Sequence, residues 1–227
     1  PQATGGPDDR LLNWNNQAAP GFMHGDDRPY GSVHRVDLFD QFPAQVDLAG
    51  VVSVMNRAAT EDVRSPAWPV VSEVLRGGGA PSELAGQVVD LLDAWVDDDA
   101  PRLDADNDGF NDHAGPTILD ALWGPLARAV VRPVFGDLTA ALDDYLDLGG
   151  NHFAGEGNNG SSIMDKDLRS LLGREVAGPF TLQYCGGGSL ETCRDDLWQV
   201  VDEVSQALAT DYGSEDPSTW LQAGQLI

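Results

Sequence analysis

Apolar residues recur at helical spacing along most of this 227-residue chain, and this periodicity limits what the chain can fold into. The segment 83–97 shows the pattern best, because its apolar residues share one face of a helix: Leu84, Val88, Leu91, Leu92 and Trp95. Similar segments predict helices at about 33–42, 47–58, 67–76, 81–97, 115–132, 137–148, 164–172 and 190–211, with Asp47, Ser82 and Thr139 as candidate N-caps.

Two short segments favour extended structure instead. An apolar stretch that runs into a turn predicts a strand at 11–16. Phe180, Leu182 and Tyr184 alternate with polar neighbours, so we expect a second strand at 178–186. The sequence therefore favours an α+β fold that is mostly helical in this chain, with a few strands.

The composition fits a folded acidic protein and excludes several classes. With 41% hydrophobic residues and six Trp, the chain can fill a core, which argues against general disorder. Acidic side chains outnumber basic ones 37 to 13, for a net charge of −24, so the chain would repel a nucleic-acid backbone. No apolar run approaches the roughly 20 residues of a membrane span.

Both ends of the sequence are unusual. It opens at Pro1 with neither an initiator Met nor a signal peptide, and it closes at Ile227 after an uncharged run. We therefore expect the chain to be a processed or cut part of a longer protein.

The two cysteines, Cys185 and Cys193, lie eight positions apart around three consecutive glycines. A disulfide that closes this short loop is the favoured interpretation, and it indicates an oxidising, extracytoplasmic setting. Two free thiols are the alternative.

An Asp-rich segment precedes the expected helix at 115–132. It satisfies half of the EF-hand loop pattern, with a glycine at position 6 and aspartates at positions 1, 3, 5 and 9: Asp104, Asp106, Asp108 and Asp112. Position 12 is Gly115 instead of a glutamate, and Pro101 interrupts the helix that would precede an EF-hand loop. Two interpretations stay open, a calcium loop of another type and an Asp-rich turn.

The motif Asn13-Trp14-Asn15-Asn16 places three amides beside a tryptophan at the end of the first expected strand. Buried amides are costly unless they find partners, and one use for such a group is as a fixed donor to a developing oxyanion. The alternative is an Asn-rich turn whose side chains bond to their own backbone.

Asn-Trp-Asn-Asn-Gln-Ala-Ala-Pro-Gly at 13–21, followed by Tyr-Gly-Ser-Val-His-Arg-Val-Asp at 30–37, resembles the penicillin acylase family of N-terminal-nucleophile hydrolases. The similarity is to the middle and C-terminal part of that family's β chain. It continues at 106–113 before the helix with Trp123, while 165–169 and the cysteine loop resemble secreted actinobacterial members. The resemblance implies a fragment of the αββα Ntn-hydrolase fold.

The resemblance also implies a division of the chain. Residues 1–42 would form part of the Ntn core, 43–212 a helical region that packs on it, and 213–227 the start of a return to the core.

Several site residues follow from the same resemblance. Asn15 would donate its side-chain amide to the tetrahedral oxyanion, and Arg35 would support Asn15 and the amine of the nucleophile. Trp14 would line the acyl pocket or pack in the core. A carboxylate between the two motifs is a calcium ligand in characterised members, which points to Asp26, with Asp27 as the alternative. Ca²⁺ is therefore the expected structural cofactor.

The family's nucleophile is an N-terminal Ser, and Pro1 has no nucleophilic side chain. We therefore expect part of a secreted bacterial acylase that hydrolyses a linear carboxamide through an acyl-enzyme on an upstream Ser. Its partners would be the α chain and the Ser-starting part of the β chain, its substrate a small acyl amide, and the chain alone would be inactive.

A different class of function also accounts for part of the sequence. A non-catalytic, calcium-stabilised secreted helical module would explain the charge and the Asp-rich segment. It leaves the motifs at 13–16 and 30–37 unexplained.

Overall fold

The structure is a computed structural model that describes residues 45–149, 159–176 and 178–224. Its longer helices are α1 (Leu48–Thr60), α2 (Trp68–Arg76), α3 (Glu83–Asp97), α4 (Gly115–Phe135), α5 (Thr139–Leu146), α6 (Asn159–Leu171) and α7 (Leu190–Tyr212). Short 3₁₀ turns lie between them, namely η2 (Ser65–Ala67), η3 (Gly136–Leu138), η4 (Cys185–Gly188) and η5 (Pro217–Thr219). The expectation of a mostly helical chain is confirmed.

Every helix expected after residue 46 has a counterpart in the structure, within a few residues except at the start of α6. Asp47 and Ser82 are N-caps, because their side chains accept the N–H groups of Gly50 and Ala85. Thr139 is not a cap, since its hydroxyl donates to the carbonyl of Gly136. The helix expected at 33–42 and the strand expected at 11–16 lie outside the described residues.

The strand expected at 178–186 is wrong. A strand needs a partner, and the N–H groups of Tyr184 and Cys185 donate instead to the carboxylate of Asp167, at 2.9 and 2.8 Å. The chain then tightens into η4. Among the described residues, extended pairing is limited to two isolated antiparallel bridges, Glu61 with Pro101 and Phe110 with Ala223.

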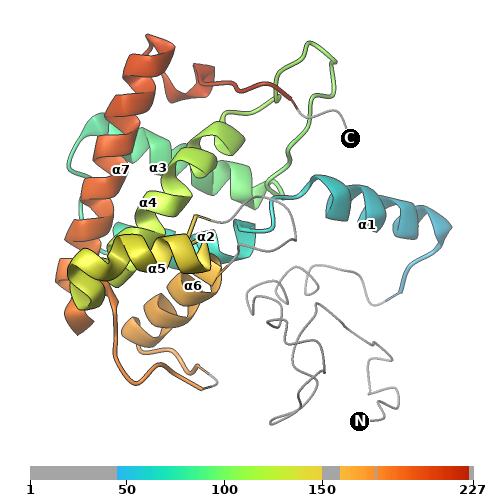
Figure 1. Ribbon diagram of the computed structural model, residues 1–227. Helices are drawn as coiled ribbons and strands as arrows, with labels where there is room; N and C mark the ends of the chain where they lie inside the picture. Colours follow the sequence, from blue (N-terminus) through green and yellow to red (C-terminus); the bar gives the residue numbers. More distant parts are fainter. Residues whose placement is uncertain (1–44, 150–158, 177, 225–227) are drawn as a thin grey trace.

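Helix α4 lies at the centre of the helical body and contacts α3, α5, α6 and α7 (Figure 1). Its residues are buried on several sides, unlike those of an amphipathic surface helix. The other buried faces come mainly from α2, α3 and α7, and together they form one continuous apolar core. Burial of this core is the main favourable contribution to the stability of the fold.

Tryptophans fill much of this core, and each described one is buried with its indole N–H satisfied. They are Trp68, Trp95, Trp123, Trp198 and Trp220, and they donate to a carboxylate, a hydroxyl or a backbone carbonyl. An indole contributes a large apolar area only if its N–H finds such a partner. These contacts fix how the helices meet.

The first residue of α4 packs directly against the ring of Trp95. A Cβ atom added at Gly115 would lie 2.2 Å from a ring carbon of Trp95, which is too close for any side chain. The glycine therefore lets α3 and α4 approach closely.

Helix α1 differs from the rest, because none of its residues is buried. It extends away from the helical body (Figure 1). No helix in the described parts of the chain is both long and apolar enough to traverse a bilayer.

Candidate functional site

The residues expected to act in catalysis and in the first calcium site lie outside the described residues. They are Trp14, Asn15, Asp26, Asp27 and Arg35. Their roles stay predictions, and so does the division of the chain at residues 42 and 212.

The Asp-rich segment is described, and three of its four expected ligands lie together. Carboxylate oxygens of Asp104, Asp106 and Asp108 are all within 4.8 Å of one another. The N–H of Asp108 donates to Asp104 and Asp106, and the N–H of Gly109 donates to Asp104, at 3.0 to 3.2 Å. Asp112 is not in this group, since its carboxylate accepts the N–H of Ala105 at 3.0 Å.

The far side of this loop pairs with the C-terminal segment 222–224. The N–H of Asn111 donates to the carbonyl of Gln222 at 3.0 Å, and the N–H of Gly224 donates to the carbonyl of Gly109 at 2.9 Å. The loop is therefore fixed on one side by backbone pairing, while its carboxylates lie on the surface. Oxygen-only donors of this kind suit a hard cation such as Ca²⁺.

The expected disulfide is present between Cys185 and Cys193, whose Cα atoms are 4.9 Å apart. Gly186 lies inside the closed loop with a φ of 56°, and a Cβ there would lie 2.4 Å from the backbone nitrogen of Cys193. Both cysteines are buried. The bond joins the end of the 178–184 segment to the first turn of α7.

Helix α6 packs against this disulfide loop and binds its backbone through Asp167. Asp167 is buried and accepts the two N–H groups that precede and begin η4. Burial raises the pKa of Asp167, and these hydrogen bonds offset only part of the effect. On the neighbouring position, the Lys166 ammonium lies 4.4 Å from the centre of the Phe180 ring, a cation–π contact.

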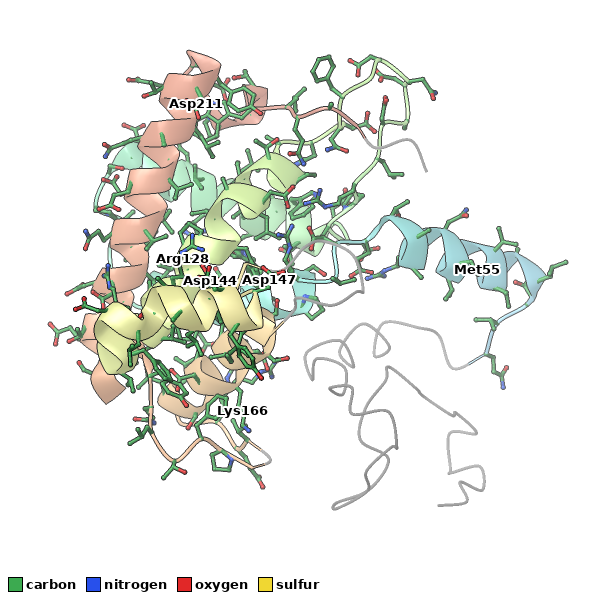
Figure 2. All side chains as sticks on the ribbon, in the orientation of Figure 1. Met55, Arg128, Asp144, Asp147, Lys166 and Asp211 are labelled. Atoms are coloured by element: carbon green, nitrogen blue, oxygen red, sulfur yellow. A yellow bond between two sulfur atoms is a disulfide. The ribbon has the colours of Figure 1, made fainter. Side chains whose placement is uncertain are left out.

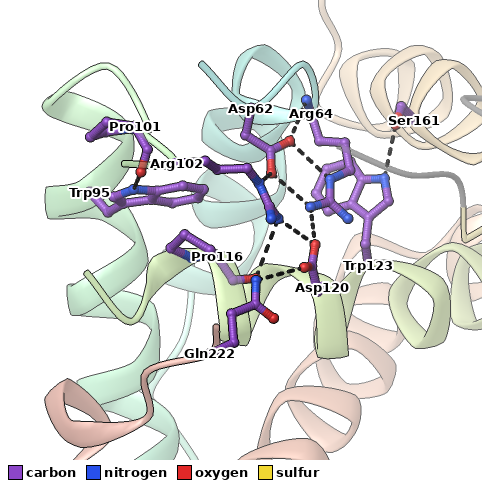
Figure 3. Close-up of polar contacts among 10 residues, drawn as sticks. All are labelled: Asp62, Arg64, Trp95, Pro101, Arg102, Pro116, Asp120, Trp123, Ser161 and Gln222. Atoms are coloured by element: carbon purple, nitrogen blue, oxygen red, sulfur yellow. Dashed lines mark hydrogen bonds and ion pairs between the residues drawn. The ribbon is translucent and has the colours of Figure 1, made fainter. Parts of the chain in front are cut away.

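A partly buried cluster of four charges, which no sequence pattern predicted, joins three parts of the fold (Figure 3). Asp62 is fully buried and accepts from Arg64 at 2.7 and 2.9 Å and from Arg102 at 2.9 Å. Asp120 on α4 accepts from both guanidinium groups. Gln222 donates to Asp120 at 3.0 Å, so the C-terminal segment joins the same network.

The charges of this cluster determine how its carboxyls titrate. Burial raises the pKa of Asp62, but the positive charge and hydrogen bonds of Arg64, together with Arg102, outweigh it, so the pKa lies below the ordinary value. The pKa of Asp120 is lowered in the same way. Two positive and two negative side chains therefore compensate one another in this cluster.

Two surface hollows lie beside α3 in the described part of the molecule. One of about 320 Å³ lies between α2 and α3, where Asp93 already accepts from Trp68, Ser72 and Arg76. The other, of about 550 Å³, lies between α3 and η5 and is lined partly by Gln87 and Leu91. Neither is lined by a histidine or a cysteine. Among the described residues, the candidate functional site is the Asp-rich loop.

The described residues form a helical fold that contains a disulfide-closed loop, and the comparison of the sequence shows the family. A family model described as "Penicillin amidase" matches residues 1–226. The chain therefore belongs to the penicillin amidase family, which is a family of amidohydrolases. The comparison with curated proteins finds no match.

Proposed function

We propose that this chain is part of a larger acylase that hydrolyses a linear carboxamide to a carboxylic acid and an amine. The match to the penicillin amidase family over residues 1–226 carries the proposal. The motifs at 13–16 and 30–37, which lie inside that match, support it.

In the proposed reaction, an N-terminal Ser on sequence outside this chain attacks the amide carbon, and its α-amine takes the hydroxyl proton. The amine of the substrate takes this proton from the α-amine and leaves, and water then hydrolyses the acyl-enzyme. The side-chain N–H of Asn15 stabilises the oxyanion in both steps. Arg35 orients Asn15 and the nucleophile's amine, because its fixed fork of donors can bind two acceptors. Trp14 lines the acyl pocket.

The proposed partners are the other polypeptides of the same precursor, namely an α chain and the Ser-starting part of the β chain. We also propose secretion from a bacterial cell. The disulfide between Cys185 and Cys193 supports an oxidising setting, since such bonds persist mainly outside the cytosol. Denaturing mass spectrometry of the protein purified from culture medium would show both the companion chains and the export.

The role of Asn15 can be tested in the intact enzyme. We expect Asn15→Ala to lower turnover of a good acyl amide by about 10² to 10³, because one oxyanion donor is lost. KM should change little, and the circular dichroism spectrum should be unaltered. Steady-state kinetics with a panel of acyl amides measures both constants.

Asn13→Ala is the matched control, since it removes the same side chain two positions earlier in the motif. It should retain turnover within a few-fold of the unmodified enzyme. Turnover of the Asn15→Ala enzyme that equals that of this control would remove Asn15 from the mechanism.

We also propose a structural Ca²⁺ ion in this protein. The grouping of Asp104, Asp106 and Asp108 supports a site at the 104–112 loop, and Asp26, with Asp27 as the alternative, stays the proposed ligand of a second site. The oxygen donors at the loop fit the cation that the family resemblance implies.

The same grouping also favours the second candidate function, a non-catalytic module stabilised by calcium. The two proposals differ in what the chain needs to fold. If calcium alone gives this chain a cooperative thermal transition and no companion chain is found, the module is supported. A transition that requires companion chains supports the acylase.

A further inference from the structure

Helix α1 carries a continuous apolar stripe that no described part of the molecule covers. Leu48, Val52 and Met55 recur at helical spacing and are 81%, 50% and 65% exposed. Figure 2 shows Met55 on the part of α1 that extends away from the helical body. The opposite side of the helix is attached at its end, where Arg57 pairs with Glu61 and Asp99.

No other segment of similar length in the described residues has as many exposed large apolar side chains as α1 and the residues just before it. Five of the large ones lie between residues 46 and 55: Val46, Leu48, Val51, Val52 and Met55. Leaving such a stripe in water forgoes about 25 cal/mol for each Å² of apolar surface that could be buried. A helix of 13 residues is also marginal without tertiary contacts. We therefore expect another part of the protein to cover the stripe.

A second copy of α1 is a poor partner. A 13-residue helix is about 20 Å long and about 10 Å wide, so one of its faces is far smaller than the roughly 800 Å² per partner of a stable complex. Two heptads of stripe also fall short of the several heptads that a coiled coil needs.

Residues 1–44 fit the stripe better. They lead directly into α1, so any contact between them is intramolecular and has a high effective concentration. Forty-four residues are close to the length below which a chain rarely builds a sufficient core of its own. The segment nevertheless contains many large apolar residues that need burial, among them Leu11, Leu12, Phe22, Phe39 and Phe42.

We propose that the apolar stripe of α1 is the docking surface for residues 1–44 of the same chain. Asn15 and Arg35 lie in that segment, so the contact would anchor the proposed oxyanion residues to the helical body. This contact depends on packing alone and does not require the proposed catalysis.

Site-specific photo-crosslinking tests the proposal in the whole protein with any companion chains present. The two native cysteines are joined in a disulfide, so Met55→Cys supplies a unique thiol to which a benzophenone maleimide can be attached. After irradiation, an endoproteinase that cleaves before aspartate separates α1 from earlier residues at Asp47. We expect the label to be linked to a peptide from residues 1–44, at the mass of a single chain.

Ser53→Cys is the matched control, because Ser53 is exposed on the side of α1 away from the stripe. It should give at least several-fold less of that link. Leu48→Glu, added to the Met55→Cys protein, should reduce the link similarly. A link to a second copy, a link to another polypeptide, or equal yields from positions 53 and 55 would each overturn the proposal.

Discussion

Asp62 shows how a single carboxylate can be buried and still be charged. It has no exposed surface, and both of its oxygens accept guanidinium N–H groups from Arg64, while Arg102 adds a further hydrogen bond. Arg64 itself is almost fully buried and lies 6.0 Å from the ring centre of Trp123. The four charges stabilise one another, because loss of one member leaves each opposite charge with one partner in place of two.

We expect Asp62→Asn to lower the free energy of unfolding by about 3–5 kcal/mol, because it leaves Arg64 and Arg102 with one negative partner in place of two. Urea unfolding near pH 7 measures the change. Asp90→Asn removes a carboxylate from an exposed pair with Arg76 and should cost less than about 1 kcal/mol. Equal losses in the two variants would mean that this cluster stabilises the fold no more than an exposed ion pair does.

At the scale of elements, the loop at 104–112 connects the start of α4 to the C-terminal segment. Its backbone pairs with residues 222–224, and a Cβ at Gly224 would lie 2.8 Å from the Cβ of Asp104. An ion bound by Asp104 would therefore act on both segments. Calcium binding to the folded form should stabilise the whole helical body by mass action.

We expect millimolar Ca²⁺ to raise the melting midpoint relative to a chelator, since a ligand at 100 times its Kd adds about 2.7 kcal/mol. Asp106→Asn should abolish most of this gain. The substitution removes one charge but keeps an oxygen that can accept the N–H of Asp108. Differential scanning calorimetry with and without the ion measures the shift. Identical midpoints in calcium and in chelator would show that the loop does not bind calcium and is an Asp-rich turn.

Elements with local signals could be predicted from the sequence, and those that depend on distant partners could not. The apolar spacing of α3 and the cap at Ser82 lie within one segment, and both are confirmed. Alternation at 178–186 predicted a strand, but whether a strand forms depends on a partner, and Asp167 takes the backbone donors instead. The start of α6 was missed because its first turn lies in a Gly- and Asn-rich stretch.

The candidate site was predictable to a similar extent. The spacing of Asp104, Asp106 and Asp108 is local, and the structure brings them together. The cluster of Asp62 and Asp120 could not be predicted, because Arg64 and Asp120 are 56 positions apart and meet only through the packing of α4. Asn15 and Arg35 stay predictions.

The molecule as a whole has a net charge of −24, and the pKa values of its buried and partly buried carboxyls are shifted in both directions. Burial raises the pKa of Glu61, Asp165 and Asp167, so the folded protein holds those protons more tightly than the unfolded chain. These groups cost stability at neutral pH, and the cost disappears as the pH falls. Asp62 and Asp120 have lowered pKa values, so their contribution is present above about pH 4 and is lost below it.

We therefore expect the melting midpoint to be higher at about pH 5 than at about pH 7.5, and to fall steeply below about pH 3. Relief of repulsion among the acidic side chains acts in the same direction between neutral and mildly acidic pH. Thermal unfolding across this range, in chelator so that metal binding does not contribute, measures the profile. A midpoint that falls steadily from pH 7.5 downward would contradict the expected balance.

Lys166 gives the molecule a practical property. It is the chain's only lysine, it is half-buried on α6, and its ammonium contacts Phe180 beside the disulfide loop (Figure 2). Reagents directed at amines thus have a single side-chain target in this sequence. A dye coupled to the Lys166 side chain would therefore lie on the side of the disulfide and away from the Asp-rich loop.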